Sequence, residues 1–565
     1  MTVPNRTITI KNGGNGVAPT GNTRYRAIIG TSSTGSIDTP TVCTAPNQVS
    51  DTFGIGPLVD AAKYELDAAG GVVVVIRTKD SVAGAITTGT AYESGSGTCT
   101  CTGTPNNRYL LTVQITTAGN LGVAVFKYSL DDGPGDDEKN WSLPVVVPSG
   151  ATYVIPNTGL TLTFGGTAFA VGDEFYFSTT APSAQSADLQ ASFVALQAYT
   201  GKWEWVHVVG ETTAAIAAAV DTKMTSCATA HKYRYAILEA VDVDMISTVT
   251  ATGTTPPTVT IAGIPRGSWS MQIDITTGGV LGTAAFKYSI DNGNTWSDAI
   301  TTTVGTGINP LGNTGLTATF ASGTYNTDNL YTFNTWDKNE AAWVTALQSA
   351  YSSTSSDRVM VCAGFGEVTL TDGKVQRRPI GWGVSAIQAR KTISDDTGQV
   401  IDAGPLPSFI TISHDEAAVP GLDDSRFCTS RYWDKIAGCY VNQGRTLAIA
   451  GSDYDLIQYR EVMDAACEAL DTAMVIEVNR KIKVDSATGY ILETEARALE
   501  NKFLSALKSA IVAPGHASSV TCSIRRADNI LSTRQINVDL EVIGVAYAKT
   551  IAATIGYKNP AITVA

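Results

Sequence analysis

The residue types that most often do chemistry are sparse in this chain and do not group along it. Four histidines stand far apart, and none belongs to a His-x-x-x-His or Cys-His pattern: His207, His231, His414 and His516. Cys99 and Cys101 lie close together, but no second pair completes a zinc site. The segment from Gly366 to Lys374 has the wrong spacing for a phosphate-binding loop, and Val375 stands where that loop has Ser or Thr. We therefore expect no catalytic residue, no metal and no cofactor.

The sharpest short motif is an Asp-box, a hairpin in which an aspartate caps the turn while Ser, Thr and Trp pack beneath it. Its residues are Ser289, Asp291, Gly293, Thr295 and Trp296. Asp-boxes recur in sialidases, so the alternative interpretation of the chain is a carbohydrate-binding or glycosidase-like adhesin. A sialidase also needs several boxes, an arginine cluster and an activated tyrosine. We expect the motif to be a structural turn.

An internal repeat surrounds this motif. Residues 115–133 and 275–293 are identical at thirteen of nineteen positions, and 157–164 returns as 313–320. A longer acidic loop, 131–138, separates the blocks in the first copy; it could take a calcium ion, but a solvated turn is the commoner use of such a run. Short alternating strands between Gly, Asn and Pro residues predict that each copy is an all-β module.

Composition excludes several classes of function. The chain has 565 residues, a formal charge of −13 and only 16% charged residues. Nucleic acid and anionic membranes require clustered positive charge, so neither is an expected partner. No apolar run reaches the length of a membrane span or of a signal peptide, and the odd cysteine count favours reduced, packed thiols.

Helices and strands alternate around the repeats and predict a mixed α/β scaffold. The expected helices are 56–69, 187–199, 213–229 and 339–351, and the expected strands are 72–76, 203–209, 235–238 and 358–362. The β modules would be insertions in the loops of this scaffold. We expect an arm at 1–22, an α/β domain from 23–83, 181–246 and 336–376, β modules at 84–180 and 247–335, and an α+β domain at 377–565.

The last part of the chain combines two helices with late strands. Ser452 can cap a helix from 453 to 479, and a second helix is expected over 493–511. Strands are expected at 520–525, 536–545 and 548–557.

The C-terminal third resembles the sheath proteins of contractile bacteriophage tails and related contractile injection systems. The resemblance is carried by Arg445-Thr-Leu447, by Asp485-x-x-Thr488-Gly489-Tyr490, and most specifically by the ending Gly544-Val-Ala-Tyr547-Ala-Lys549-Thr550-Ile551 with Ile555-Gly556-Tyr557. At the other end, Tyr25–Gly30 and Gly56-Pro57-Leu58 look like the first strand and following helix of a sheath. Where sheaths often carry Trp-Gly, this chain has Asn442-Gln443-Gly444.

The resemblance implies a structural, non-enzymatic subunit of a virion tail, assembled in the host cytoplasm. Such subunits stack as hexameric rings around an inner tube, contact a baseplate and a tail terminator, and contract to drive the tube through the host envelope. The family links subunits by exchanging terminal strands, which implies that role for Thr7, Ile8, Thr9, Ile10, Ile551, Ile555 and Ile562. The family's inner layer is its C-terminal domain, so Arg480, Lys481 and Lys483 are expected to face the tube, although positive charge at a helix end explains them equally well.

Overall fold

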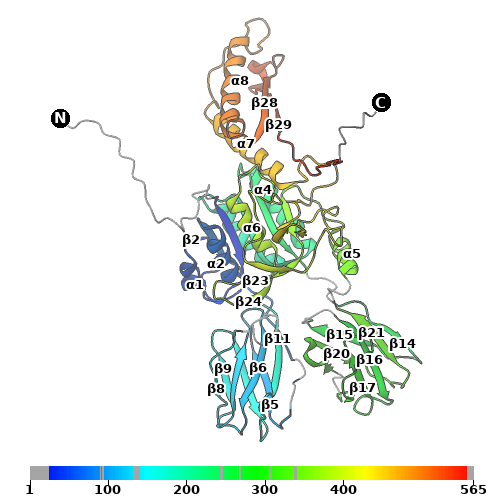
Figure 1. Ribbon diagram of the computed structural model, residues 1–565. Helices are drawn as coiled ribbons and strands as arrows, with labels where there is room; N and C mark the ends of the chain where they lie inside the picture. The colour runs from blue at the N-terminus through cyan, green and yellow to red at the C-terminus, as the bar shows by residue number, and fades with distance from the viewer. Residues whose placement is uncertain are drawn as a thin grey trace, which may run out of the picture. The chain divides into compact units, whose positions relative to one another are not determined.

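The computed structural model describes residues 24–88, 91, 94–130, 140–241, 246–263, 265, 269–304, 308–335 and 340–556. These residues divide between Ile457 and Gln458 into two compact units, and the elements of each are labelled in Figure 1. None of the helices in these ranges is both long and apolar enough to cross a membrane.

A six-stranded sheet forms the centre of the first unit. Its order is β2-β3-β1-β12-β13-β22, with β1 (Arg26–Gly30), β2 (Thr41–Cys43), β3 (Val73–Arg77), β12 (Trp205–Thr212), β13 (Tyr235–Ala240) and β22 (Val359–Cys362). Five strands are parallel, and only β2, at one edge, is antiparallel. The strands are near-continuous runs of buried apolar residues, which is typical of a parallel sheet covered on both faces.

Helices cover both faces of this sheet. One face carries α3 (Ser186–Ala198), α4 (Ala214–Thr229) and α5 (Glu340–Tyr351), whose apolar side chains pack on Ile29 and Val206. The other face carries α1 (Pro46–Phe53), α2 (Pro57–Ala69) and α6 (Gly381–Arg390). The predicted mixed α/β character is confirmed, and α2 to α5 begin within a residue or two of the expected positions.

Two antiparallel β sandwiches interrupt the α/β order. The first follows β3, and its sheets have the orders β4-β11-β6-β7-β8 and β5-β10-β9. Its strands are β4 (Ile86–Thr88), β5 (Thr98–Gly103), β6 (Leu110–Thr117), β7 (Val125–Ser129), β8 (Val145–Val146), β9 (Thr152–Ile155), β10 (Leu160–Gly165) and β11 (Glu174–Thr179).

The second sandwich follows β13 and repeats the first strand for strand, with the orders β14-β21-β16-β17-β18 and β15-β20-β19. Its elements are β14 (Thr250–Thr252), β15 (Val259–Gly263), β16 (Ser270–Thr277), β17 (Ala285–Ser289), β18 (Ile300–Thr301), β19 (Ile308–Pro310), a 3₁₀ turn at Gly312–Thr314, β20 (Leu316–Phe320) and β21 (Leu330–Asn334).

The rest of the first unit contains two small antiparallel sheets. One has the order β24-β23-β25, from β23 (Phe365–Thr369), β24 (Val375–Pro379) and β25 (Phe409–Ile412). The other is the hairpin of β26 (Ser430–Trp433) and β27 (Ile436–Val441).

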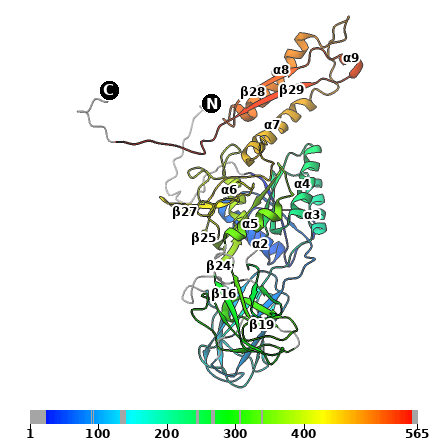
Figure 2. The same cartoon turned by 90° about the vertical axis from the view of Figure 1, so that its right-hand side faces the viewer.

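The second unit packs helices against a two-stranded sheet (Figure 2). Its elements are α7 (Ile457–Val475), α8 (Glu493–Leu507) with a π-helical turn at Lys508–Val512, β28 (Ala517–Ile524), the short α9 (Ile530–Thr533) and β29 (Val538–Gly544). Helix α7 is shorter than the expected 453–479 at both ends. Ser452 Oγ accepts a hydrogen bond from Tyr454 N, so it caps a turn before the helix, and Asn479 adopts the left-handed conformation just after it.

Candidate functional site

The β28–β29 hairpin leaves one edge of each strand without a partner strand in the described part of the chain. Arg525 N donates to Asn537 O at 3.1 Å, so alternate pairs from there inward, such as Thr521 with Glu541, share the hydrogen bonds within the hairpin. The intervening residues of β29, Val538, Leu540 and Val542, therefore direct their N–H and C=O groups away from β28. That edge presents main-chain groups to which a further strand can be added.

The chain after β29 does not form the expected third strand. Residues 545–556 have no regular structure, so the strand predicted over 548–557 is wrong for this chain by itself. The physical reason is that a strand exists only in a ladder, and no neighbouring strand pairs with this segment within the described residues. Ile551 and Ile555 are 85% and 98% exposed, so their side chains add almost no burial energy to the stability of a single chain. Thr7, Ile8, Thr9, Ile10 and Ile562 lie outside the described residues.

The basic group after α7 adjoins exposed apolar side chains. Arg480 pairs with Glu477 at 2.7 Å and reaches Glu495 at 3.7 Å, while Lys481 and Lys483 are exposed. Four apolar residues at the end of α7 are also largely exposed: Met474, Val475, Ile476 and Val478. Contiguous apolar exposure beside positive charge is typical of a surface that another molecule covers.

The Asp-box residues lie together in one turn after β17. Asp291 accepts hydrogen bonds from Thr295 N at 2.8 Å and Thr295 Oγ1 at 2.7 Å, and Ser289 Oγ accepts from Gly293 N at 2.8 Å. The hydrogen bonds from Thr295, followed by the one from Ser289, lower the pKa of Asp291 to about 2. Trp296 is 37% exposed, with Lys287 Nζ 5.4 Å from the centre of its ring. Both carboxylate oxygens accept hydrogen bonds from within the turn, so the arrangement stabilises a hairpin.

A buried ionic cluster at the centre of the α/β sheet was missed by sequence reasoning. Glu65 of α2 binds Arg26 Nε at 2.8 Å and His207 Nδ1 at 2.6 Å, and the other nitrogen of His207 lies 3.1 Å from Glu239 Oε1. All four side chains are at most 1% exposed. Burial opposes the charged imidazole, but the hydrogen bonds to Glu239 and Glu65 outweigh it and raise the pKa of His207 to about 9.

His207 is therefore charged at neutral pH, where it lies between Glu65 and Glu239. Ser385 of α6 donates to Glu65 Oε2 at 2.9 Å, and Gly210 N donates to Glu239 Oε2 at 2.7 Å. The network joins β1, β12, β13, α2 and α6. No group of acidic, His and Cys side chains in the described ranges could hold a metal ion. Arg26, His207 and Glu239 each stand next to apolar residues of a strand, but nothing in the sequence shows that they meet.

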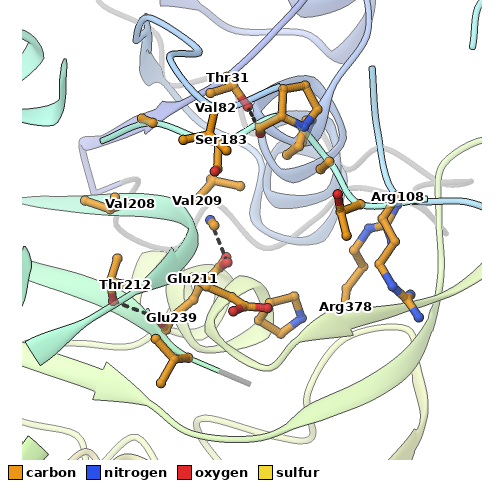
Figure 3. A pocket seen from close by; sticks show the side chains of 18 of the residues that line it. Thr31, Val82, Arg108, Ser183, Val208, Val209, Glu211, Thr212, Glu239 and Arg378 are labelled. Carbon is orange, nitrogen blue, oxygen red and sulfur yellow. Dashed lines mark hydrogen bonds between the residues drawn. The ribbon is translucent and has the colours of Figure 1, made fainter. Parts of the chain in front are cut away.

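A cavity of about 560 Å³ opens beside the cluster, at the carboxyl ends of β1, β12 and β13 (Figure 3). Thr31, Val208 and Val209 line its strand side, and Arg108, Arg377 and Arg378 line another. Thr31 Oγ1 donates to Pro182 O at 2.8 Å, which holds the segment returning from the first sandwich over the cavity.

Comparisons with known proteins give the following relatives. The family described as DUF2586, N-terminal domain matches residues 4–255. No curated protein sequence matches the chain. Similar solved structures include the sheath tail protein of Desulfitobacterium hafniense, with 10% identity, a TM-score of 0.40 and coverage of 96% of this chain and 100% of that one.

Two further structures are of the same kind. The sheath tail protein of Listeria innocua has 10% identity and a TM-score of 0.39, covering 93% of this chain and 96% of that one. The helical sheath of the anti-feeding prophage, in its contracted state, has 9% identity and a TM-score of 0.44, covering 98% and 99%. Similarity at this level leaves the function to be inferred from the chain's own residues.

Proposed function

We propose that this protein is a structural tail-sheath subunit that polymerises into a helical contractile sheath around an inner tail tube. The observation that carries the proposal is the incomplete β28–β29 sheet followed by an exposed tail with β-branched residues. An edge and a tail that have no partner strand among the described residues are aggregation hazards in a monomer and become useful contacts in a polymer. A head-to-tail contact of this kind does not close on itself and generates a helix of subunits.

The central sheet of the first unit offers little free edge for an added strand. The edge of β22 is already occupied, because Cys428 N donates to Val361 O at 2.9 Å and Leu447 N donates to Val359 O at 2.9 Å. The opposite edge is the three-residue antiparallel strand β2, where Val42 O accepts a hydrogen bond from Gln48 Nε2 at 3.1 Å. We therefore assign the acceptor role to β28–β29 and the donor roles to the arm at 1–22, with Thr7 to Ile10, and to the tail with Ile551, Ile555 and Ile562.

The ends of each β sandwich lie where they are expected for a domain inserted into a loop of the scaffold and projecting from it. Where the chain leaves and re-enters the scaffold at the first sandwich, Val82 and Ser183 exchange backbone hydrogen bonds of 3.0 and 2.9 Å. At the second, Ile246 pairs with Thr335 in an isolated bridge. Adjacent ends allow a domain to be inserted without disturbing its host. The domain limits expected from the sequence are part of this proposal, and the compact unit that begins at 458 lies within the C-terminal sheath domain, 377–565.

The remaining parts of the proposal concern partners and motion. Arg480, Lys481 and Lys483, together with the exposed end of α7, would face the inner tube, and the ends of the sheath would contact a baseplate and a tail terminator. Contraction would release energy stored during assembly, with no nucleotide consumed, because flexible strand exchange lets rings slide without dissociating. The protein would be found in the virion tail after assembly in the host cytoplasm.

Deleting residues 1–20 tests the proposal. The truncated chain should remain a soluble monomer with near-normal thermal unfolding, whereas the full chain should form tubes visible by negative-stain microscopy. Ile10→Pro should act like the deletion, because proline removes one main-chain donor from the added strand. Ordered tubes from the truncated chain would refute strand exchange through this arm. Monodisperse full-length chains at high concentration would refute the sheath role and favour a discrete adhesin.

A further inference from the structure

The cavity beside the buried cluster lies at a particular point of the sheet. In chain order, the five parallel strands are arranged second, first, third, fourth, fifth, so the direction of winding reverses between β1 and β12. Loops that follow strands on either side of such a reversal diverge and leave a crevice, which is where doubly wound sheets bind their ligands. The cavity lies there, lined by Thr31 just after β1 and by the end of β12.

Positive charge predominates in the lining. Arg108 comes from the first sandwich, Arg377 and Arg378 come from β24, and the acidic residues among the lining are Glu211 and Glu239. Glu239 is already engaged, because its carboxylate accepts a hydrogen bond from Gly210 N and contacts the charged His207. Figure 3 shows Arg108 and Arg378 together, apart from Val208 and Val209.

Contacts with neighbouring groups hold Arg377 and Arg108 in the wall of the cavity. The Arg377 guanidinium lies 4.0 Å from the centre of the Phe365 ring, and Arg108 Nη1 donates to Arg377 O at 3.2 Å. Guanidinium groups fixed in this way suit phosphate and carboxylate oxygens, which they bind in a bidentate manner. The apolar part of the wall, with Val82, Val209 and Phe365, suits the body of an organic molecule.

We propose that this cavity binds a small organic phosphate, with the phosphate at the arginines and the organic part against the carboxyl ends of β1 and β12. Its volume of about 560 Å³ falls within the range of small-molecule sites. A phosphate monoester carries nearly two negative charges. The guanidinium groups of Arg108 and Arg377 can balance these charges, while Arg378 also pairs with Asp60 at 3.5 Å. The proposal does not depend on the sheath role, since it concerns the folded first unit alone.

Titration calorimetry on the full-length chain tests it, with AMP and ribose 5-phosphate as organic probes and inorganic phosphate and adenosine as controls. AMP or ribose 5-phosphate should bind, and Arg377→Gln should weaken that binding at least tenfold. Arg431→Gln is the matched control, because Arg431 also stacks on an aromatic ring, Trp433, at 3.7 Å but does not line the cavity. Arg431→Gln should leave the affinity unchanged.

A second variant separates a loss of binding from a loss of folding in Arg377→Gln. Ala83→Trp should fill the cavity and abolish binding while the thermal unfolding midpoint stays within a few degrees of that of the parent chain. The proposal is overturned if neither organic probe binds at millimolar concentration, if inorganic phosphate binds as tightly as the organic probes, or if Arg377→Gln and Arg431→Gln weaken binding equally.

Discussion

The α/β sheet of the first unit and the β28–β29 hairpin of the second differ in one respect. They differ in how far their backbone hydrogen-bonding groups and charged side chains find partners within one chain. The α/β sheet has little free edge, because Cys428 and Leu447 bond to β22 and Gln48 bonds to β2. Its cluster of Arg26, Glu65, His207 and Glu239 is buried. The hairpin has open edges, and its ion pairs, such as Arg525 with Asp539, are more than half exposed. The α/β sheet pairs its groups within a single chain, whereas the hairpin leaves main-chain groups that a neighbouring strand can bind.

Breaking the buried cluster should have the largest effect on folding. Glu65→Ala leaves Arg26 and His207 buried without their shared carboxylate, which should lower the free energy of unfolding by about 3–5 kcal/mol. Asp539→Ala is the matched control, because Asp539 pairs with Arg525 and both side chains are more than half exposed. It should lower the free energy of unfolding far less, because solvent screens an exposed ion pair. Urea denaturation of the two variants measures the difference, and equal losses would contradict the role given to the cluster.

The same cluster should make stability depend on pH. The pKa of His207 rises from 6.5 to about 9 on folding, because hydrogen bonds to its carboxylates outweigh the effect of burial. Its contribution is therefore complete below pH 6.5 and is lost as the pH rises through about 9. The loss should be on the order of 3 kcal/mol. His207→Gln should flatten the unfolding free energy between pH 6.5 and 9; an unchanged slope would show that another group titrates.

The exposed ion pairs of the second unit should matter least. Hydrogen bonds from Arg526 and then Arg497 lower the pKa of Glu493 to about 2, so its contribution is present above pH 4.5 and lost as the pH falls through about 2. Because these charges face solvent, salt screens them. Glu493→Gln should change the urea midpoint at neutral pH only slightly, and less still in 0.5 M salt. A shift as large as that of Glu65→Ala would contradict the contrast between the two regions.

The contrast also explains what could be predicted from the sequence. Apolar runs such as Val73–Ile76 and the 3.6-residue period of α3 are local patterns, so the α/β elements were predicted closely. The buried cluster could not be predicted, because Glu65, His207 and Glu239 meet only through strand register and helix packing. A strand was also predicted over 548–557, but a strand needs a neighbour, which the described residues of this chain do not supply.

The central claim is that the outer edge of β29 receives a strand from another subunit, and Val542 tests it most directly. Its N–H points away from β28, so Val542→Pro removes a donor from the open edge and none from the hairpin. Val542→Ala shortens the same side chain and keeps the donor. The account predicts similar thermal unfolding for both monomers, tubes from Val542→Ala, and none from Val542→Pro by negative-stain microscopy. Ordered tubes from Val542→Pro would contradict it.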